Sequence, residues 1–302
     1  MKMQNRYNGI YFILFIVIIF FAACNYTKLV PKGDALYTGA TVKVKDSTLS
    51  KKQKNEVVDK TEHLPRPKPN GKFLGIPFKL AFYNLAGNPE KKGFFRKILR
   101  NLGEPPVLLS SLNLDYNKKV LKSYLENIGY FHAAATGDTS VKNKKAHATY
   151  TLEPDGLYTI KDVNFIIDST SLGKTILATK PKSLFKTGDA FNLDVIKGER
   201  SRVDALLKEE GYYFFSPDAL IADADSTIGN NKVNMYLEVK ENTPLVARKP
   251  YIIDSVFIYP NYRINAKDPD TSHLSPTFYH GYYIVDPRKK FKAKLFPRIM
   301  RF

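Results

Sequence analysis

Several short motifs carry residue types that could do chemistry, but each lacks the partners that this chemistry needs. Residues 173–175 are Gly-Lys-Thr, the end of a phosphate-binding loop, yet the pattern requires a glycine five positions before Gly173, where Asp168 stands. Ser183 and Lys186 have the Ser-x-x-Lys spacing of an acyl-transferring serine, without its companion motifs. We therefore predict neither a nucleotide site nor a serine nucleophile.

Metal-ligating residue types are present without metal-ligand spacing. The five histidines are His63, His132, His147, His273 and His280. They form no HExxH pattern, and His147 falls on the polar face of a predicted strand, where solvent is its expected partner. The carboxylates of residues 222–226, ADADS, lack the glycine and ligand spacing of a calcium loop and are typical of a turn. We predict no metal, no cofactor, no small-molecule substrate and no enzymatic activity.

The only cysteine, Cys24, lies where an apolar run ends. Met1–Gly9 carries two cations, and the following 14 residues, Ile10–Ala23, carry no charge. A spanning helix needs roughly 20 apolar residues, so this run is short for one. A positive start, a short apolar stretch and small residues at its end are typical of a secretory signal peptide. With no second cysteine, a disulfide framework and a thiolate metal site are excluded.

The residues just before Cys24 indicate what its thiol does. Residues 21–23, Phe-Ala-Ala, resemble a bacterial lipobox in which Phe replaces the usual Leu. This resemblance implies a lipoprotein signal peptide over 1–23, acylation of the Cys24 sulfur with palmitate-type chains, and a lipidated tether over 24–34. The alternative is an ordinary signal peptide, or a short buried helix with an inert cysteine.

Charge and composition limit the class of partner. The 302 residues suggest about two domains, and 43% hydrophobic residues suffice for packed cores. The formal net charge is +18, and it falls to +16 when Lys2 and Arg6 leave with the signal peptide. Such a balance points to nucleic acid, an anionic membrane surface or acidic partners, and export disfavours nucleic acid.

A basic amphipathic helix is predicted within Lys91–Pro106. Its apolar residues at helical spacing are Phe94, Phe95, Ile98, Leu99 and Leu102. Its surrounding cations are Lys91, Lys92, Arg96, Lys97 and Arg100. Such a helix can lie on an anionic membrane, which makes these cations candidates for membrane-surface contact. The favoured alternative is a helix packed on its own domain with a solvated basic face.

The first half of the chain predicts one set of elements. We expect a strand over 36–44, a helix over 50–62, a Pro-rich break over 64–72 and a helix over 78–87. A further helix is predicted to start at a capping Asp115, to carry an apolar stripe at 121, 124, 125 and 128, and to end at Gly129. Strands are predicted over 130–136 and 146–154, the second with clean alternation.

The second half repeats this order. The predicted elements are a strand over 160–168, a helix within 171–185, a helix from a capping Asn192 to Gly211, and strands over 212–220 and 232–240. The phrases LENIGYF (125–131) and LKEEGYYFF (207–215) place their glycines 82 residues apart. IIDSVF at 252–257 likewise repeats the IKDVNF phrase at 160–165. The sequence therefore predicts a repeated β-α-α-β-β unit of about 80–90 residues.

A β-α-α-β-β repeat behind an export signal resembles the POTRA domains of the BamA/TamA outer-membrane assembly family, a bacterial surface antigen family. The lipobox, residues 24–33 (CNYTKLVPKG) and residues 102–110 (LGEPPVLLS) resemble its lipidated TamL branch. The resemblance implies an α+β fold of tandem POTRA-like domains, each a small mixed sheet covered by two helices on one face. The implied domains are 35–155, with an insert at 64–110, and 156–243.

A third POTRA-like domain is expected to begin at Tyr251 with one strand. We predict a loop over 261–283, and we expect residues 251–302 to stop before the second helix of that domain and before the β-barrel that follows POTRA domains in the family. Insertase activity is accordingly not carried over from the resemblance.

The resemblance implies protein recognition without catalysis. A POTRA-like sheet leaves an edge strand to which an extended client adds through main-chain hydrogen bonds. The predicted client-binding residues are Tyr130, Phe131, Tyr212, Tyr213, Phe214 and Phe215. Proline at Phe215 is expected to weaken client binding, and His147→Ala to have no effect. Alternatively, these strands only complete the sheet.

The implied partners are nascent outer-membrane proteins or a periplasmic assembly partner, and the implied location is the outer membrane, lipid-anchored, with the body in the periplasm. The alternative functions are a structural lipoprotein that tethers envelope layers through its basic surface without clients, and an exported enzyme with an unfamiliar site.

Overall fold

The computed structural model describes residues 26–88, 90–260, 262, 275–286 and 288–300. The proposed signal peptide and Cys24 lie outside these residues. The chain packs as two compact units. One contains residues up to 166 with 182–199 and 222–237, and the other contains 167–181, 200–221 and 238 onward.

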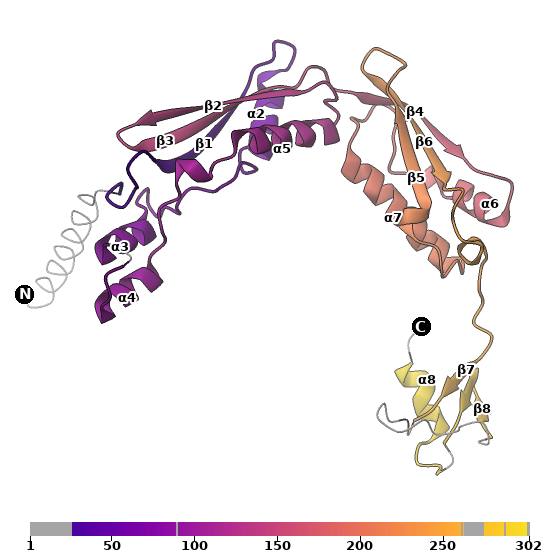
Figure 1. Ribbon diagram of the computed structural model, residues 1–302. Coiled ribbons are helices and arrows are strands. Elements are labelled where there is room, and N and C mark those ends of the chain that lie inside the picture. The colour runs from indigo at the N-terminus through magenta and orange to yellow at the C-terminus, as the bar shows by residue number, and fades with distance from the viewer. Residues whose placement is uncertain (1–25, 89, 261, 263–274, 287, 301–302) are drawn as a thin grey trace, which may run out of the picture. The chain divides into compact units, whose positions relative to one another are not determined.

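The first sheet has the strand order β1-β3-β2 (Figure 1). β1 (Leu36–Val44) runs parallel to β3 (Lys145–Glu153), and β2 (Ala134–Lys142) is antiparallel to β3. The β2–β3 connection is the two-residue turn Asn143–Lys144, with φ values of 51° and 58°. Two successive positive φ values are typical of the tight turns whose twist matches that of a hairpin.

Helices α2 (Lys51–Thr61) and α5 (Leu114–Asn127) pack on one face of this sheet. Val57 and Leu121 lie against Tyr150 and Leu152 in one buried cluster. On β3 the residues at even positions from 146 to 152 are buried, while the intervening residues are only half-buried. The alternation predicted for β3 is therefore confirmed, and it directs one face to the core and the other to solvent.

The N-terminus of α5 differs in detail from the prediction. Its N-cap is Asn113, whose side chain accepts from the Tyr116 N–H at 2.9 Å, so the prediction of Asp115 as the cap was wrong. Asp115 instead lies in the first turn and forms an ion pair with Lys118 at 2.7 Å. Both arrangements are favourable, because a short polar side chain satisfies free amides and a carboxylate complements the positive helix end.

Between α2 and α5 the chain inserts a helical hairpin, formed by α3 (Phe78–Ala86) and α4 (Phe94–Leu102). The insert is fastened to the domain by buried asparagine side chains. Asn70 donates to the Pro105 carbonyl at 2.8 Å and accepts from the Val107 N–H at 3.0 Å. Asn117 of α5 forms two hydrogen bonds with the backbone of Arg66 and one with the Tyr150 hydroxyl.

The second sheet has the order β4-β6-β5, with β4 (Thr159–Ile166), β6 (Lys232–Val239) and β5 (Leu220–Asp225). Its core joins Ile160, Val233 and Met235 to Ile196 in the first half of α7 (Leu193–Glu209). Asn192 precedes α7 and accepts from the Asp194 N–H at 2.8 Å, as predicted for a cap. Thr170 caps α6 (Ser171–Ala178) by accepting from the Gly173 N–H.

The third sheet has the order β7-β9-β8, with β7 (Val256–Ile258) parallel to β9 (Tyr282–Ile284) and β8 (Thr277–Tyr279) antiparallel to β9. The predicted loop over 261–283 therefore contains a hairpin, and that part of the prediction was wrong. The short turn at His280 and Gly281 has φ values of 47° and 85°. Strands of three residues are too short for their alternation to stand out in the sequence.

The remaining helical segments are short. They are α8 (Phe296–Ile299) and the 3₁₀ turns Leu109–Ser111, Lys180–Lys182, Pro217–Ala219, Leu245–Arg248 and Ala293–Leu295. The predicted class is confirmed: the chain is α+β, built of small three-stranded sheets with helices, and the same strand order recurs in each sheet. No helix in the described part of the chain is long and apolar enough to cross a bilayer.

Candidate functional site

The aromatic residues predicted to form edge strands lie in turns that precede those strands. The Ala133 N–H donates to the Tyr130 carbonyl at 3.1 Å, and the Phe215 N–H donates to the Tyr212 carbonyl at 3.0 Å. Such i→i+3 bonds define turns. The strands begin only at Ala134 and Leu220.

This placement has a physical cause. Each phrase follows a helix end at which a glycine takes a positive φ, 98° at Gly129 and 88° at Gly211. The chain must then turn again to reach the sheet. Tyr130, Tyr212 and Phe215 have exposed fractions of 5%, 2% and 2%, so they anchor the turn in the core. The prediction that these residues lie in strands was wrong, and proline at Phe215 would disturb a core turn rather than a sheet edge. Their binding of a client stays a prediction.

The first aromatic phrase instead holds the segment that leads into the second sheet. The Gly129 carbonyl accepts from the Tyr158 N–H at 2.8 Å. The Phe131 ring contacts the rings of Tyr158 and Phe191, with centroids at 4.6 Å and 4.8 Å. A Cβ at Gly129 would lie 2.9 Å from the Phe191 carbonyl oxygen, so only glycine permits this approach.

The second phrase makes the same contacts with the segment that leads toward β7. The Gly211 carbonyl accepts from the Tyr251 N–H at 2.7 Å, and the Phe214 and Tyr251 ring centroids lie 5.1 Å apart. A Cβ at Gly211 would lie 2.6 Å from the Tyr251 carbonyl oxygen. The repeated phrase is therefore a joint between consecutive repeats, and the sequence signal for it was its recurrence.

The first strand of each of the first two sheets is hydrogen-bonded at its start to a returning segment. The Tyr37 N–H donates to the Val107 carbonyl at 2.8 Å, and the Leu109 N–H donates to the Ala35 carbonyl at 2.8 Å. In the second sheet the Ile160 N–H donates to the Asp189 carbonyl at 2.8 Å. The starts of β1 and β4 are thus already hydrogen-bonded on their outer side.

The opposite edge of the first sheet is β2, which pairs only with β3 among the described residues. Lys142 and Lys145 flank the two-residue turn, and such a flanking pair is hydrogen-bonded. Since pairs alternate along an antiparallel ladder, the even-numbered residues of β2 bond to β3 and the odd-numbered residues direct their amides outward. The outward residues are Ala135, Gly137, Thr139 and Val141.

One of these outward amides is already occupied by the strand's own side chain. The Thr139 N–H donates to Asp138 Oδ1 at 2.8 Å, which agrees with an outward orientation of that amide. A carboxylate on an edge strand discourages indiscriminate pairing between sheets. Most side chains of β2 are small, so an added strand meets little steric obstruction, and Val141 is 56% exposed beside the turn.

β5 is the corresponding edge of the second sheet. Its residues, LIADAD, include Asp223 and Asp225, and Asp225 Oδ1 accepts from the Thr227 hydroxyl at 2.7 Å and its N–H at 2.9 Å. These hydrogen bonds lower the pKa of Asp225 and keep it a carboxylate. The ADADS segment is thus a strand end and turn, as a structural role requires.

The basic residues around α4 divide into two groups. Arg96 donates to the Ala86 carbonyl at 3.0 Å, and Arg100 donates to the Asn88 and Lys91 carbonyls at 2.8 Å and 2.7 Å, so both arginines hold the hairpin together. Lys91, Lys92 and Lys97 are exposed. Of the five cations predicted to contact a membrane surface, these three lysines are the ones that face solvent.

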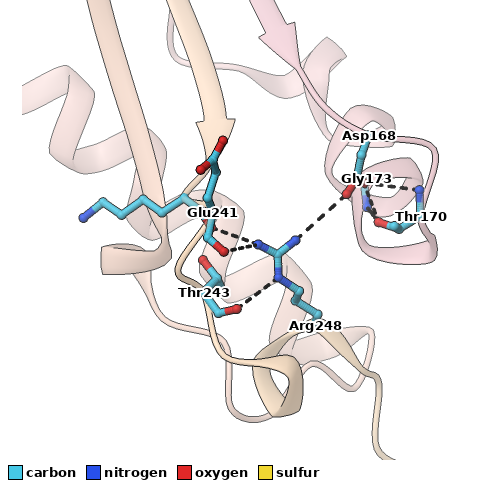
Figure 2. A network of polar contacts seen from close by, with 7 residues as sticks. Asp168, Thr170, Gly173, Glu241, Thr243 and Arg248 are labelled. Carbon is cyan, nitrogen blue, oxygen red and sulfur yellow. Dashed lines mark hydrogen bonds and ion pairs between the residues drawn. The ribbon is translucent and has the colours of Figure 1, made fainter.

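An arginine network closes the second β-α-α-β-β repeat (Figure 2). Arg248 donates to the carbonyls of Lys240, Glu241 and Thr243 at 2.9, 3.2 and 3.1 Å, and it lies 4.0 Å from the Asp168 carboxylate. Asp168 also accepts from the Thr170 N–H. This network fixes the end of β6 to the turn before α6, just ahead of the joint at Tyr251.

The described residues provide no grouping of metal-ligating side chains. No three His, Cys, Asp or Glu residues in the described part of the chain lie close enough to share a metal. Burial raises the pKa of Tyr37 to about 12, consistent with a neutral core residue. His147 bonds with the Thr41 hydroxyl at 2.8 Å on the open face of the first sheet.

No protein-family model matches the chain, and no curated protein matches it significantly. Among solved structures it is similar to POTRA domains 3–5 of Haemophilus influenzae BamA, with 16% identity over 79% of this chain and 76% of that chain and a TM-score of 0.39. It is also similar to POTRA domains 1–2 of Anabaena Omp85, with 8% identity over 68% and 96% of the two chains and a TM-score of 0.31. At these values the likeness says nothing about activity or partners.

Proposed function

We propose that the chain is the periplasmic POTRA arm of a lipidated, TamL-like member of the BamA/TamA group, and that it binds extended segments of outer-membrane proteins or a periplasmic assembly partner without catalysing a reaction. The observation that carries this proposal is the asymmetry of the sheets. The starts of β1 and β4 are hydrogen-bonded to returning segments, whereas no such segment is hydrogen-bonded along β2 and β5, which end their sheets among the described residues. Strand addition uses such edges.

The proposal also includes the arrangement of the arm. Acylated Cys24 and the tether 24–34 would fix it to the outer membrane, and 35–155 and 156–243 would be successive POTRA-like domains. The joint at Gly129 and the joint at Gly211 support this division, because the tyrosine that each glycine carbonyl bonds, Tyr158 or Tyr251, precedes the first strand of a new sheet.

A substitution on β2 tests strand addition. We expect Val141→Pro to weaken binding of an unfolded outer-membrane strand peptide by about fivefold, because it removes one outward amide worth on the order of 1 kcal/mol and places a ring on the edge. Val141→Thr, which keeps the amide, is the matched control. Isothermal titration measures both affinities, and circular dichroism checks folding.

Equal affinity of the folded Val141 variants would contradict strand addition at β2. Binding that disappears at high salt and is indifferent to both substitutions would favour the structural tether with a basic surface instead.

A substitution at Asp138 is expected to strengthen peptide binding instead of weakening it. Asp138→Ala releases the Thr139 amide from its carboxylate and should strengthen peptide binding by about two- to fivefold. Asp138→Asn, which keeps an accepting oxygen, should leave binding close to that of the original chain. Weaker binding by the alanine variant, measured in the same titration, would show that the carboxylate contributes to recognition rather than blocking it.

A further inference from the structure

The α3–α4 insert presents an apolar helix face that no described residue covers. None of the residues of α4 is buried. Phe94 and Phe95 have exposed fractions of 74% and 79%, and Ile98 and Leu102 have 40% and 58%. Spacings of three, four and eight place these four side chains on one side of the helix. Exposed apolar patches of this kind mark sites of interaction.

The other side of α4 is firmly seated against α3, so the apolar face is not a sign of a detached helix. The two helices lie side by side (Figure 1). A Cβ at Gly103 would lie 2.6 Å from the Tyr83 backbone nitrogen, which shows how closely the chain approaches α3. Arg96 fastens the same side to the carbonyl of Ala86 at the end of α3, and Arg100 fastens it to carbonyls of the connecting loop.

Charge around this face favours an anionic occupant. The exposed lysines Lys91, Lys92 and Lys97 flank it, while the carboxylates of the region are Glu90 and Glu104. With both arginines included, five cations stand against two carboxylates. Aromatic residues beside lysines are typical of helices that lie in the headgroup region of a membrane.

The N-terminal segment brings the anchor site to the same hairpin. Asn84 of α3 donates to the Tyr26 carbonyl at 3.1 Å, and Val30 packs against Leu80 of α3. Cys24 precedes Tyr26 by two residues in the sequence, so a lipid there would be attached two residues from this contact. A lipid on Cys24 would therefore bring the bilayer to α3 and α4.

We propose that α4 lies on an anionic bilayer surface, with Phe94, Phe95, Ile98 and Leu102 in the boundary between headgroups and acyl chains. The hairpin is then a second membrane contact beside the anchor, and it fixes how the first domain faces the membrane. This inference rests on the proposed lipidation of Cys24 for its location, but its contact with lipid can be measured separately.

The absence of tryptophan provides a direct test. Full-length protein carrying Phe95→Trp is reconstituted in vesicles of phosphatidylglycerol and phosphatidylethanolamine that contain brominated acyl chains. We expect a blue-shifted emission and strong quenching by the bromine. Tyr213→Trp, at a position that is 70% exposed in the joint phrase, is the matched control and should stay unquenched. Equal emission and quenching at the two positions would overturn the proposal.

Charge reversal tests the headgroup contact. In the Phe95→Trp protein, Lys91→Glu, Lys92→Glu and Lys97→Glu together should lower the preference of the hairpin for the anionic surface by at least about 100-fold, and the quenching should be lost. The control reverses the exposed lysines Lys142, Lys144 and Lys145 of the β2–β3 turn, with the same change in net charge. Equal loss of quenching in both sets would overturn a local contact.

The mass of the N-terminal peptide of the Phe95→Trp protein separates this inference from lipidation. An acylated Cys24 together with an unquenched indole would contradict the hairpin contact and support the lipid anchor. A quenched indole in a protein without acyl groups would support the hairpin contact and remove the anchor. An unquenched indole without acyl groups would overturn both.

Discussion

Replacing Asn117 with leucine is expected to lower the free energy of unfolding by about 2–4 kcal/mol. The Asn117 side chain is fully buried, and its Nδ2 donates to the Arg66 carbonyl at 2.6 Å and to the Tyr150 hydroxyl at 2.8 Å. Its Oδ1 accepts from the Arg66 N–H at 2.9 Å. Leucine fills nearly the same volume but leaves three polar groups without these partners, and each unsatisfied buried group costs about 1–3 kcal/mol.

Denaturant unfolding measures this effect, and Asn127→Leu is its control. Asn127 lies on the same helix and is exposed, so the same substitution there should change the stability by no more than about 0.5 kcal/mol. We also expect faster proteolysis within 64–72, since Asn117 holds this segment to α5. If the free energy of unfolding of the Asn117 variant changed by no more than about 0.5 kcal/mol, water would have to replace the asparagine, and the Asn117 hydrogen bonds would contribute little to stability.

The second large effect on the free energy of unfolding is expected at the joint between Gly211 and Tyr251. Gly211→Ala should lower the free energy of unfolding by about 2–4 kcal/mol, because a non-glycine residue at a φ of 88° costs about 1–2 kcal/mol and the new Cβ meets backbone. That Cβ would lie 2.6 Å from the Tyr251 carbonyl oxygen. The Tyr251 segment must shift to make room, which should weaken the hydrogen bond to the Gly211 carbonyl and the ring contact with Phe214.

Gly229→Ala is the control that separates the conformational cost of alanine at a positive φ from the steric clash of the new Cβ at position 211. Gly229 has a φ of 78°, and nothing lies within 4 Å of its Cβ position, so only the conformational cost of about 1–2 kcal/mol is expected there. Denaturant unfolding compares the two variants, and limited proteolysis over 249–255 tests whether the segment has been released. Equal destabilisation and equal cleavage in the two variants would mean that the close approach at Gly211 does not hold the joint.

These joints give the repeated phrases a role that suits a chain of small domains. Hydrogen bonding of a glycine carbonyl to the tyrosine that opens the next repeat ties the end of one helix to the start of the following strand. β2 and β5 end their sheets among the described residues, and these are the edges at which we propose that partners add. The aromatic phrase and the sheet edge, which the sequence analysis combined into one site, are two separate features.

The order of elements could be predicted from the sequence because it depends on local periodicity. The alternation in β3, the helical spacing of Leu121 and Leu125, and the positive-φ glycines at 129 and 211 each act over a few residues. The recurrence of the LENIGYF phrase revealed the repeat for the same reason. The repeated β-α-α-β-β order followed from these patterns together, and the resemblance to POTRA domains then implied the α+β class.

The location of the free edges was decided only by the tertiary structure. The Tyr37 N–H donates to the Val107 carbonyl and the Leu109 N–H donates to the Ala35 carbonyl, so these bonds join segments about 70 residues apart, and no local pattern encodes such pairing. The aromatic phrases misled for a related reason: Tyr212–Phe215 have high strand propensity, but the turn after Gly211 and the burial of Tyr212 and Phe215 override it. Local propensity fixes which elements form, whereas contacts between distant segments determine which edges and faces remain for partners.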